Sequence, residues 1–126
     1  MEFIWVGIGG FLGANARNSA EKVINNWLGT AFPYGTFIVN ITGAFIIGII
    51  ATYLSERYLD EPYLKQLLVV GFLGGYTTFS SYSLDAINLF EDGKWQEALL
   101  YIVGSNGLGI LACFLGVVLT RRLILG

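Results

Sequence analysis

Long apolar segments separated by short polar connections make up almost the whole chain. The apolar segments cover roughly residues 3–28, 33–53, 62–90 and 95–123, and the connections contain NNWLGT, SERYLDE and EDGKW. Each segment reaches the length of about 20 helical residues that is needed to cross the apolar core of a bilayer. The pattern therefore predicts an all-α membrane protein, in which residues 1–126 form a single domain of four transmembrane helices.

The composition agrees with a membrane protein and excludes several other classes. Of the 126 residues, 55% are hydrophobic and 13% are charged, and the mean hydropathy is +0.65, which sets the chain apart from soluble domains. The net charge of -2 argues against a nucleic-acid partner. The lack of histidine removes the commonest metal ligand, and the single cysteine, Cys113, excludes an intrachain disulfide. The start MEFIWVGIGG has no basic region and no small-residue cleavage site, so no removable signal peptide is expected.

The basic residues are almost evenly divided between the two sides of the predicted membrane domain. One side carries Arg57, Lys65, Arg121 and Arg122, and the other carries Lys22, Lys94 and Arg17. The positive-inside rule then gives little preference for either orientation. We therefore expect the chain to insert both ways and to pair with an inverted copy of itself. Small residues in GIGGFLGANA, GAFIIGIIA and GSNGLGILACFLG favour close helix contacts, either within one subunit or in such a dimer.

The third apolar segment contains an unusual polar stretch, GGYTTFSSYS, at residues 74–83. Glycine disfavours a helix, and serine and threonine side chains compete for its backbone hydrogen bonds. A broken helix inside a membrane is tolerated where it is buried in protein or lines a cavity. Free carbonyl groups at such a break suit a cation, whereas free N–H groups and hydroxyls suit an anion. The stretch therefore predicts a functional break in the third helix at mid-membrane depth.

The other polar groups at membrane depth indicate which ion the break would serve. Most of them are hydrogen-bond donors, namely Arg17, Thr36, Asn40, Tyr101 and Ser105. Four of them have an alternative role: Arg17 can snorkel to the surface, Asn40 can join two helices, and the Tyr101–Ser105 face can serve for packing alone. No carboxylate lies deep in a segment, Asp85 and Glu21 being the nearest. Phe79 and Tyr82, three apart, would favour an anion through their ring edges and a cation through their ring faces. Because most of the polar groups at membrane depth are hydrogen-bond donors, they favour an anion over a cation as the ion at the break.

The order GGFLGANAR, GTFIVN and GGYTTFSSYS along the whole chain resembles the Fluc family of fluoride channels. The resemblance implies an antiparallel dimer in the cell membrane that carries fluoride passively out of the cytoplasm through pores at the subunit interface. It also implies a structural Na⁺ at the dimer centre, held by backbone carbonyls of Gly74 and Thr77. The implied pore residues are Asn40, Phe79, Tyr82, Thr78, Ser80 and Arg17, with a polar track of Tyr101, Ser105, Gly109 and Cys113.

The chain departs from the Fluc pattern at three positions. Tyr82 stands where phenylalanine is familiar, and Gly109 and Cys113 replace expected hydroxyl residues. These departures leave a heterodimer with a homologue open, although the charge balance favours a homodimer. The main alternative function is a dual-topology exporter similar to the small multidrug resistance family, which would need a carboxylate within the first segment. A membrane scaffold that does not transport is a third alternative. The sequence shows neither a pair of a nucleophile and a base nor a metal-binding cluster, so an enzyme is not expected.

Overall fold

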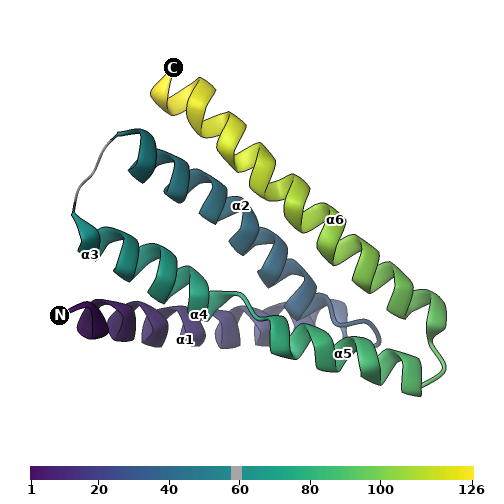
Figure 1. Cartoon of the computed structure of the whole chain (residues 1–126). Coiled ribbons are helices and arrows are strands. Elements are labelled where there is room, and N and C mark those ends of the chain that lie inside the picture. The colour runs from purple at the N-terminus through teal and green to yellow at the C-terminus, as the bar shows by residue number, and fades with distance from the viewer. Residues whose placement is uncertain (58–60) are drawn as a thin grey trace.

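The computed structural model of the chain describes residues 1–57 and 61–126, and within these ranges it is helical and has no strand (Figure 1). The elements in chain order are α1 (Glu2–Leu28), α2 (Tyr34–Glu56), α3 (Pro62–Leu64), η1 (Lys65–Leu73), α4 (Gly74–Tyr76), α5 (Phe79–Glu91), α6 (Trp95–Leu119) and η2 (Thr120–Leu125). The elements η1 and η2 are π-helical, which means that they are wound more widely than an α-helix. The prediction of an all-α protein is confirmed.

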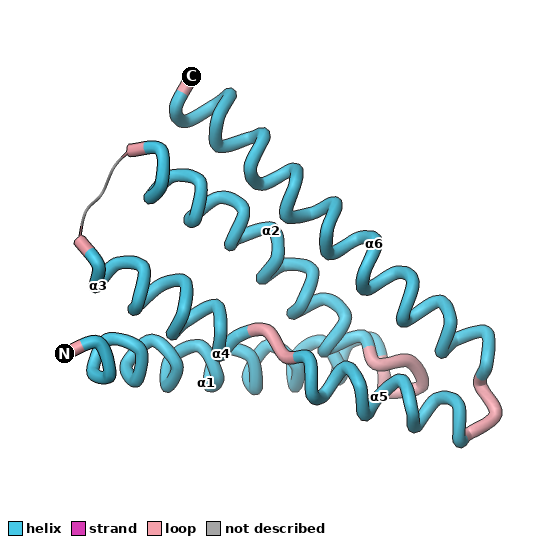
Figure 2. Tube along the Cα trace, in the orientation of Figure 1, coloured by secondary structure: helices cyan, strands magenta, loops and turns pink. Residues whose placement is uncertain are grey.

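The short elements join into long helices that match the four predicted segments. Leu64, Lys65, Leu73 and Gly74 all have α-helical backbone angles, so α3, η1 and α4 form one continuous helix from Pro62 to Tyr76. Thr77 and Thr78 are extended, and α5 starts directly after them (Figure 2). The predicted break in the third helix is therefore confirmed. Part of the connection at SERYLDE, residues 58–60, lies outside the described residues.

Three of these helical stretches are long and apolar enough to cross a membrane. They are Tyr34–Glu56, Pro62–Glu91 and Trp95–Ile124. With 27 residues α1 also has the length, but Arg17, Glu21 and Lys22 make it more polar than the others. Its crossing of the bilayer, and with it the four-span domain, stays a prediction. Both termini lie at the same end of the bundle, as an even number of crossings requires (Figure 1).

Glycines set how closely α1 approaches the first half of the third helix. A Cβ atom added at Gly9 would overlap the carbonyl oxygen of Leu67, and one added at Gly13 would overlap that of Phe72. Only glycine permits this backbone contact, because any side chain would push the two helices apart.

The second close pair is α2 with α6, which run side by side in the same direction (Figure 1). A Cβ atom at Gly48 of α2 would overlap the carbonyl oxygen of Cys113, and one at Gly116 of α6 would overlap that of Phe45. These reciprocal contacts fix the register of the two helices, because a shift along either axis would bring larger side chains into the contact.

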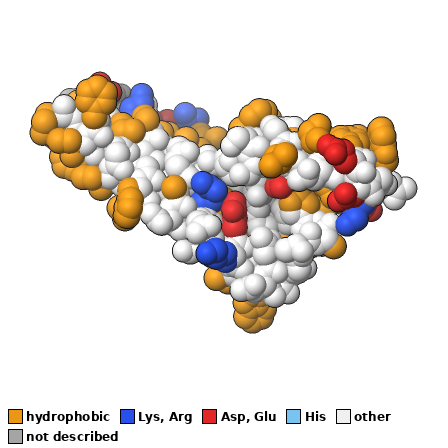
Figure 3. All heavy atoms as spheres, turned by 90° about the horizontal axis from the view of Figure 1, so that it is seen from below, with side chains coloured by type: hydrophobic (Ala, Val, Ile, Leu, Met, Phe, Trp, Pro, Cys, Tyr) orange, Lys and Arg blue, Asp and Glu red, His pale blue; other side chains and the backbone are white. Residues whose placement is uncertain are grey.

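The interior of the single chain is small, and most large apolar side chains face outward. The buried cluster contains Tyr82, Ala86, Leu89, Ala98 and Tyr101, where α5 meets α6. Phe3, Phe11, Val70, Val103 and Ile110 are among the many exposed apolar residues, and hydrophobic side chains are spread over the face seen in Figure 3. Such a surface is stable in lipid and would aggregate in water.

The contact between α2 and α6 leads to a prediction about stability. We expect Gly48→Leu to force the two helices apart and to lower the free energy of unfolding by about 2 kcal/mol or more. Thermal unfolding in detergent measures the effect. The matched control is Gly7→Leu on α1, where an added Cβ atom meets nothing within 4 Å. Equal stability of the two variants would show that the Gly48 contact is not a constraint.

Candidate functional site

The break between α4 and α5 consists of two extended residues whose side chains replace lost backbone hydrogen bonds. The Thr77 hydroxyl donates to the carbonyl oxygen of Leu73 at 3.0 Å. Thr78 caps the N-terminus of α5, since its Oγ1 accepts from the backbone N–H of Ser81 at 3.2 Å. The same oxygen lies 3.3 Å from Oγ of Ser80. Hydroxyl residues at these positions therefore stabilise the break itself.

Asn40 of α2 holds the break from outside the third helix. Its Nδ2 donates to the carbonyl oxygen of Thr78 at 2.9 Å, and its Oδ1 accepts from the backbone N–H of Thr78 at 2.8 Å. One side-chain amide thus satisfies both backbone groups of an extended residue, as a neighbouring β-strand would. The interhelical hydrogen bond that the sequence left open as an alternative is present, and one N–H of Asn40 remains available.

The break leaves the backbone carbonyl groups of residues 74–77 without their helical donors. That of Gly75 accepts from Arg17 instead, and Gly74 and Thr77 are the two of these residues that line the groove. In a continuous helix the Thr78 N–H would reach the carbonyl of Gly74, and the Ser81 N–H would reach that of Thr77. The first N–H goes to Asn40 and the second to the Thr78 side chain. Neither carbonyl oxygen accepts a hydrogen bond from another part of the described chain. Both residues line the same groove, and free carbonyl oxygens are of the ligand type that hard cations prefer.

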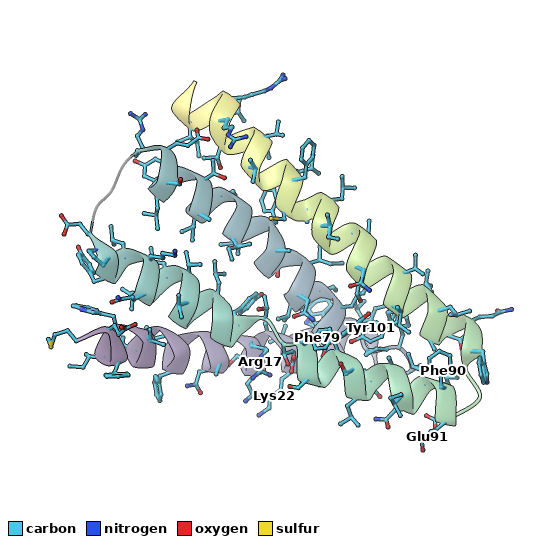
Figure 4. All side chains as sticks on the ribbon, in the orientation of Figure 1. Arg17, Lys22, Phe79, Phe90, Glu91 and Tyr101 are labelled. Carbon is cyan, nitrogen blue, oxygen red and sulfur yellow. The ribbon has the colours of Figure 1, made fainter. Side chains whose placement is uncertain are left out.

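Arg17 lies beside the break and is paired within the subunit (Figure 4). Its Nε donates to the carbonyl oxygen of Gly75 at 3.1 Å, and its Nη1 lies 3.8 Å from Oε1 of Glu21. The buried Thr36 of α2 donates to the same Glu21 oxygen at 3.4 Å. Arg17 therefore does not simply snorkel. It ties α1 to the break, and two of the predicted donors are directed at a carboxylate.

Most predicted site residues line one groove of about 460 Å³ between α2, the third helix and α6. The groove residues that the sequence singled out are Asn40, Gly74, Thr77, Thr78, Phe79, Tyr82, Ser105, Gly109 and Cys113. Arg17, Thr36, Ser80 and Tyr101 are not among the lining residues. The structure therefore brings the break, the aromatic pair and the α6 track together, and it places four predicted residues outside this groove.

The aromatic side chains form a chain of contacts from the groove to the buried cluster. Phe79 is 77% exposed, and its ring centre lies 5.6 Å from that of Tyr82. The ring of Tyr82 lies 5.2 Å from the fully buried Tyr101. Figure 4 shows Phe79 and Tyr101 close to the break, where α5 approaches α6. Phe79 is thus the most exposed of these three aromatic residues, and Tyr101 is mainly a packing element.

Two hydrogen bonds between α5 and α6 were not anticipated from the sequence. Tyr101 donates its hydroxyl to Oδ2 of Asp85 at 3.1 Å, and Nδ2 of Asn106 donates to the Tyr82 hydroxyl oxygen at 3.1 Å. The signal was present, because Tyr82 and Asp85 are three apart on one helix face. The sequence did not show which residues of α6 these two side chains would contact.

Ser105 differs from every other polar side chain that the structure describes. Its Oγ is buried and has no hydrogen-bond partner in the described part of the chain, although the residue lines the groove. A buried hydroxyl without a partner lowers stability by about 1–3 kcal/mol. Such a group is expected where a ligand, an ion or water completes the site. No cluster of His, Cys, Asp or Glu among the described residues has the form of a metal site.

The Asn40 contacts predict how the break responds to substitution. In Asn40→Leu both backbone groups of Thr78 lose their partners, so we expect the free energy of unfolding to fall by about 2 kcal/mol or more. Asn40→Asp keeps the acceptor for the N–H and should lose less if the carboxyl group is neutral. Thermal unfolding in detergent at low and neutral pH compares the two variants. Asn40→Leu with the stability of the unmodified protein would contradict the clamp.

Comparison with known proteins places the chain in a family. Residues 4–117 match the family described as CrcB-like protein, Camphor Resistance (CrcB). The relative named "Fluoride-specific ion channel FluC" from Magnetococcus marinus is 43% identical over 121 residues, covering 96% of this chain and 98% of the relative. Relatives of the same name from Rhizobium meliloti (44% over 119 residues) and Aquifex aeolicus (41% over 118 residues) each cover 94% of this chain and 95% of their own length. The resemblance seen in the sequence is confirmed: this chain belongs to the CrcB-like protein family.

Proposed function

We propose that this chain forms a fluoride-selective channel of the cell membrane, through which fluoride leaves the cytoplasm passively. The names of the relatives identify the ion. The observation from the structure that carries the proposal is the groove, in which an unpartnered hydroxyl, an amide and an exposed aromatic ring meet beside a broken membrane helix. Channel transport is not an enzymatic reaction, and no catalytic group is required.

The groove offers donors that replace the hydration shell of a small anion. Fluoride holds its water strongly, so a pore must supply several donors, each weak enough to let the ion move on. Ser105 contributes a buried O–H that has no partner among the described residues, and Asn40 contributes the N–H that Thr78 does not use. Phe79 is exposed at the groove, where its positive ring edge can meet the ion.

The two carboxylates near the break both accept hydrogen bonds from neighbouring hydroxyl groups, and Glu21 also pairs with a cation. Asp85 accepts from Tyr101, while Glu21 accepts from Thr36 and pairs with Arg17. These contacts lower the repulsion that a bare carboxylate would exert on an approaching anion. Tyr101 and Thr36 therefore act through the carboxylates, to which they donate their single O–H groups, whereas Arg17 keeps further N–H donors. Ser80 acts through its contact with Thr78.

The proposal includes an antiparallel homodimer as the conducting unit. Phe79, which lines the groove of the single chain, is largely exposed. A second, inverted copy would enclose the groove and cover apolar surface, and the even distribution of basic residues allows both orientations in one membrane. A homologue as the second subunit is the alternative partner, and lipids surround the remaining surface.

A structural Na⁺ at the centre of that dimer is also part of the proposal. The fit rests on the free carbonyl oxygens of Gly74 and Thr77, which lose their helical donors at the break. Two such carbonyls from each of two chains supply four oxygen ligands of the kind that hard cations prefer. Bound Na⁺ would hold the two broken helices together by charge, and this chain contributes the extended conformation that exposes the carbonyls.

The drug-exporter alternative has no support in the structure. Such an exporter would need a carboxylate within α1 that exchanges protons with a cationic substrate. Beyond its first turn, the only acidic residue of α1 is Glu21, whose carboxylate pairs with Arg17 and accepts a hydrogen bond from Thr36. Family membership points the same way, as the relatives carry the name of an ion channel.

The proposed function predicts passive and selective efflux. Liposomes that contain only this purified protein should release fluoride when a K⁺ ionophore balances charge, and chloride release should be at least about 100-fold slower. Ion-selective electrodes measure both. Empty liposomes are the control, and clamping the pH on both sides tests independence from a proton gradient. Equal rates for the two ions, or strict dependence on a proton gradient, would contradict the proposal.

The exposed ring in the groove yields a second functional prediction. Phe79→Ile keeps the apolar volume but removes the ring edge, so fluoride efflux should fall at least about tenfold, or about 1.4 kcal/mol on the barrier. Phe11→Ile is the matched control, since Phe11 is 70% exposed on α1 and does not line the groove. Size-exclusion profiles verify assembly. Undiminished efflux through a well-assembled Phe79→Ile protein would end the ring-edge hypothesis.

A further inference from the structure

The hydroxyl group of Tyr82 is a feature that the ring-edge mechanism leaves unused. Tyr82 lines the groove, and its ring lies between Phe79 and Tyr101, with ring centres 5.6 Å and 5.2 Å away. Only 9% of the surface of Tyr82 is exposed. A phenylalanine would fill the same space, so packing alone does not require the hydroxyl.

The contacts of Asn106 show whether the Tyr82 hydroxyl donates or accepts in their shared hydrogen bond. Nδ2 of Asn106 lies 3.0 Å from the carbonyl oxygen of Ile102 and 3.1 Å from the Tyr82 hydroxyl oxygen. A backbone carbonyl only accepts hydrogen bonds, so the Asn106 atom beside it must be the NH₂ group rather than the oxygen. The same NH₂ group therefore donates to Tyr82. The hydroxyl oxygen is the acceptor, and its own hydrogen is left over.

The leftover hydrogen has no acceptor within the described protein. The bond from Asn106 is the only hydrogen bond of the Tyr82 hydroxyl among the described residues. The neighbouring Ser105 Oγ, one position before Asn106 on α6, also lacks a partner and lines the same groove. Two residues that line the groove from two helices thus carry hydroxyl groups whose donor capacity no described protein group uses.

We propose that the Tyr82 hydroxyl is an additional donor for fluoride in this groove, beyond the ring edge that a phenylalanine would supply, and that Asn106 is its positioning residue. This inference rests on the channel function proposed above. An N–H bond to the phenol oxygen directs the O–H away from Asn106 and polarises it, which makes it a stronger donor. Fluoride is a smaller and stronger acceptor than chloride, so a directed donor favours it more.

A purely structural role is the competing explanation for the Tyr82–Asn106 bond. In that case the bond only joins α5 to α6, and its loss would change stability without changing the ratio of fluoride to chloride flux. A donor role changes fluoride flux selectively while assembly stays intact. The two roles are separated by measuring flux of both ions per assembled protein.

The test is a double-mutant cycle of Tyr82→Phe and Asn106→Leu in proteoliposomes. Each change is close in volume to the original residue and suits a membrane helix. Tyr82→Phe should slow fluoride efflux at least about fivefold, and Asn106→Leu should slow it in the same direction, both with unchanged chloride leak. Because Asn106 acts through the hydroxyl, the double variant should be no slower than Tyr82→Phe alone within about twofold.

The matched control is Tyr76→Phe, which removes another phenol hydroxyl close to the break. The Tyr76 hydroxyl pairs with Oγ1 of Thr42 at 3.0 Å and lies outside the groove lining, so this variant should keep its fluoride efflux. Unchanged efflux in Tyr82→Phe would overturn the inference, as would penalties that multiply in the double variant. If the unmodified protein does not prefer fluoride, the proposed function itself fails. If the unmodified protein prefers fluoride and the Tyr82→Phe variant is fully active, only this inference is contradicted and the proposed function stands.

Discussion

The architecture depends on the pair of hydrogen bonds between the Asn40 side chain and the backbone of Thr78. In an apolar membrane an extended residue has no water to satisfy its N–H and C=O groups, so a helix can stay broken only if protein groups replace the helical partners. Asn40 does this for both groups at once. The N–H groups that would bond to the carbonyls of Gly74 and Thr77 are then diverted, and Thr78 caps the N-terminus of α5. The ring of Tyr82 on α5 packs against Tyr101 of α6.

Close helix packing supplies the frame in which this clamp works. Gly9 and Gly13 bring α1 onto the first half of the broken helix, while Gly48 and Gly116 bring α2 onto α6. Since α2 carries Asn40, its register against α6 also decides where the clamp meets the groove. The frame leaves most large apolar side chains on the outside, where lipid and a second subunit can cover them.

The polar groups around the break are divided between those that are satisfied and those that are not. Arg17, Thr36 and Tyr101 direct hydrogen bonds to a carbonyl or a carboxylate, which stabilises the subunit. Ser105 and the Tyr82 hydrogen remain without an acceptor in the described chain. Unused donors in an apolar protein reduce stability, and such local cost is expected at functional sites, where a passing ion completes the missing bonds. Selective conduction and maximal stability therefore make opposite demands on the same groove.

The sequence by itself determined the helices and the break, because both follow from local chemistry. Apolar segments of membrane length predict helices wherever they occur, and glycines followed by hydroxyl residues weaken a helix at a definite place, which the structure has at Thr77 and Thr78. Only the tertiary structure decided which donors are free. Asp85 with Tyr101, Asn106 with Tyr82 and Arg17 with Gly75 are separated by 16, 24 and 58 positions. Their meeting depends on the register and rotation of helices that are distant in the chain, and no local pattern encodes that.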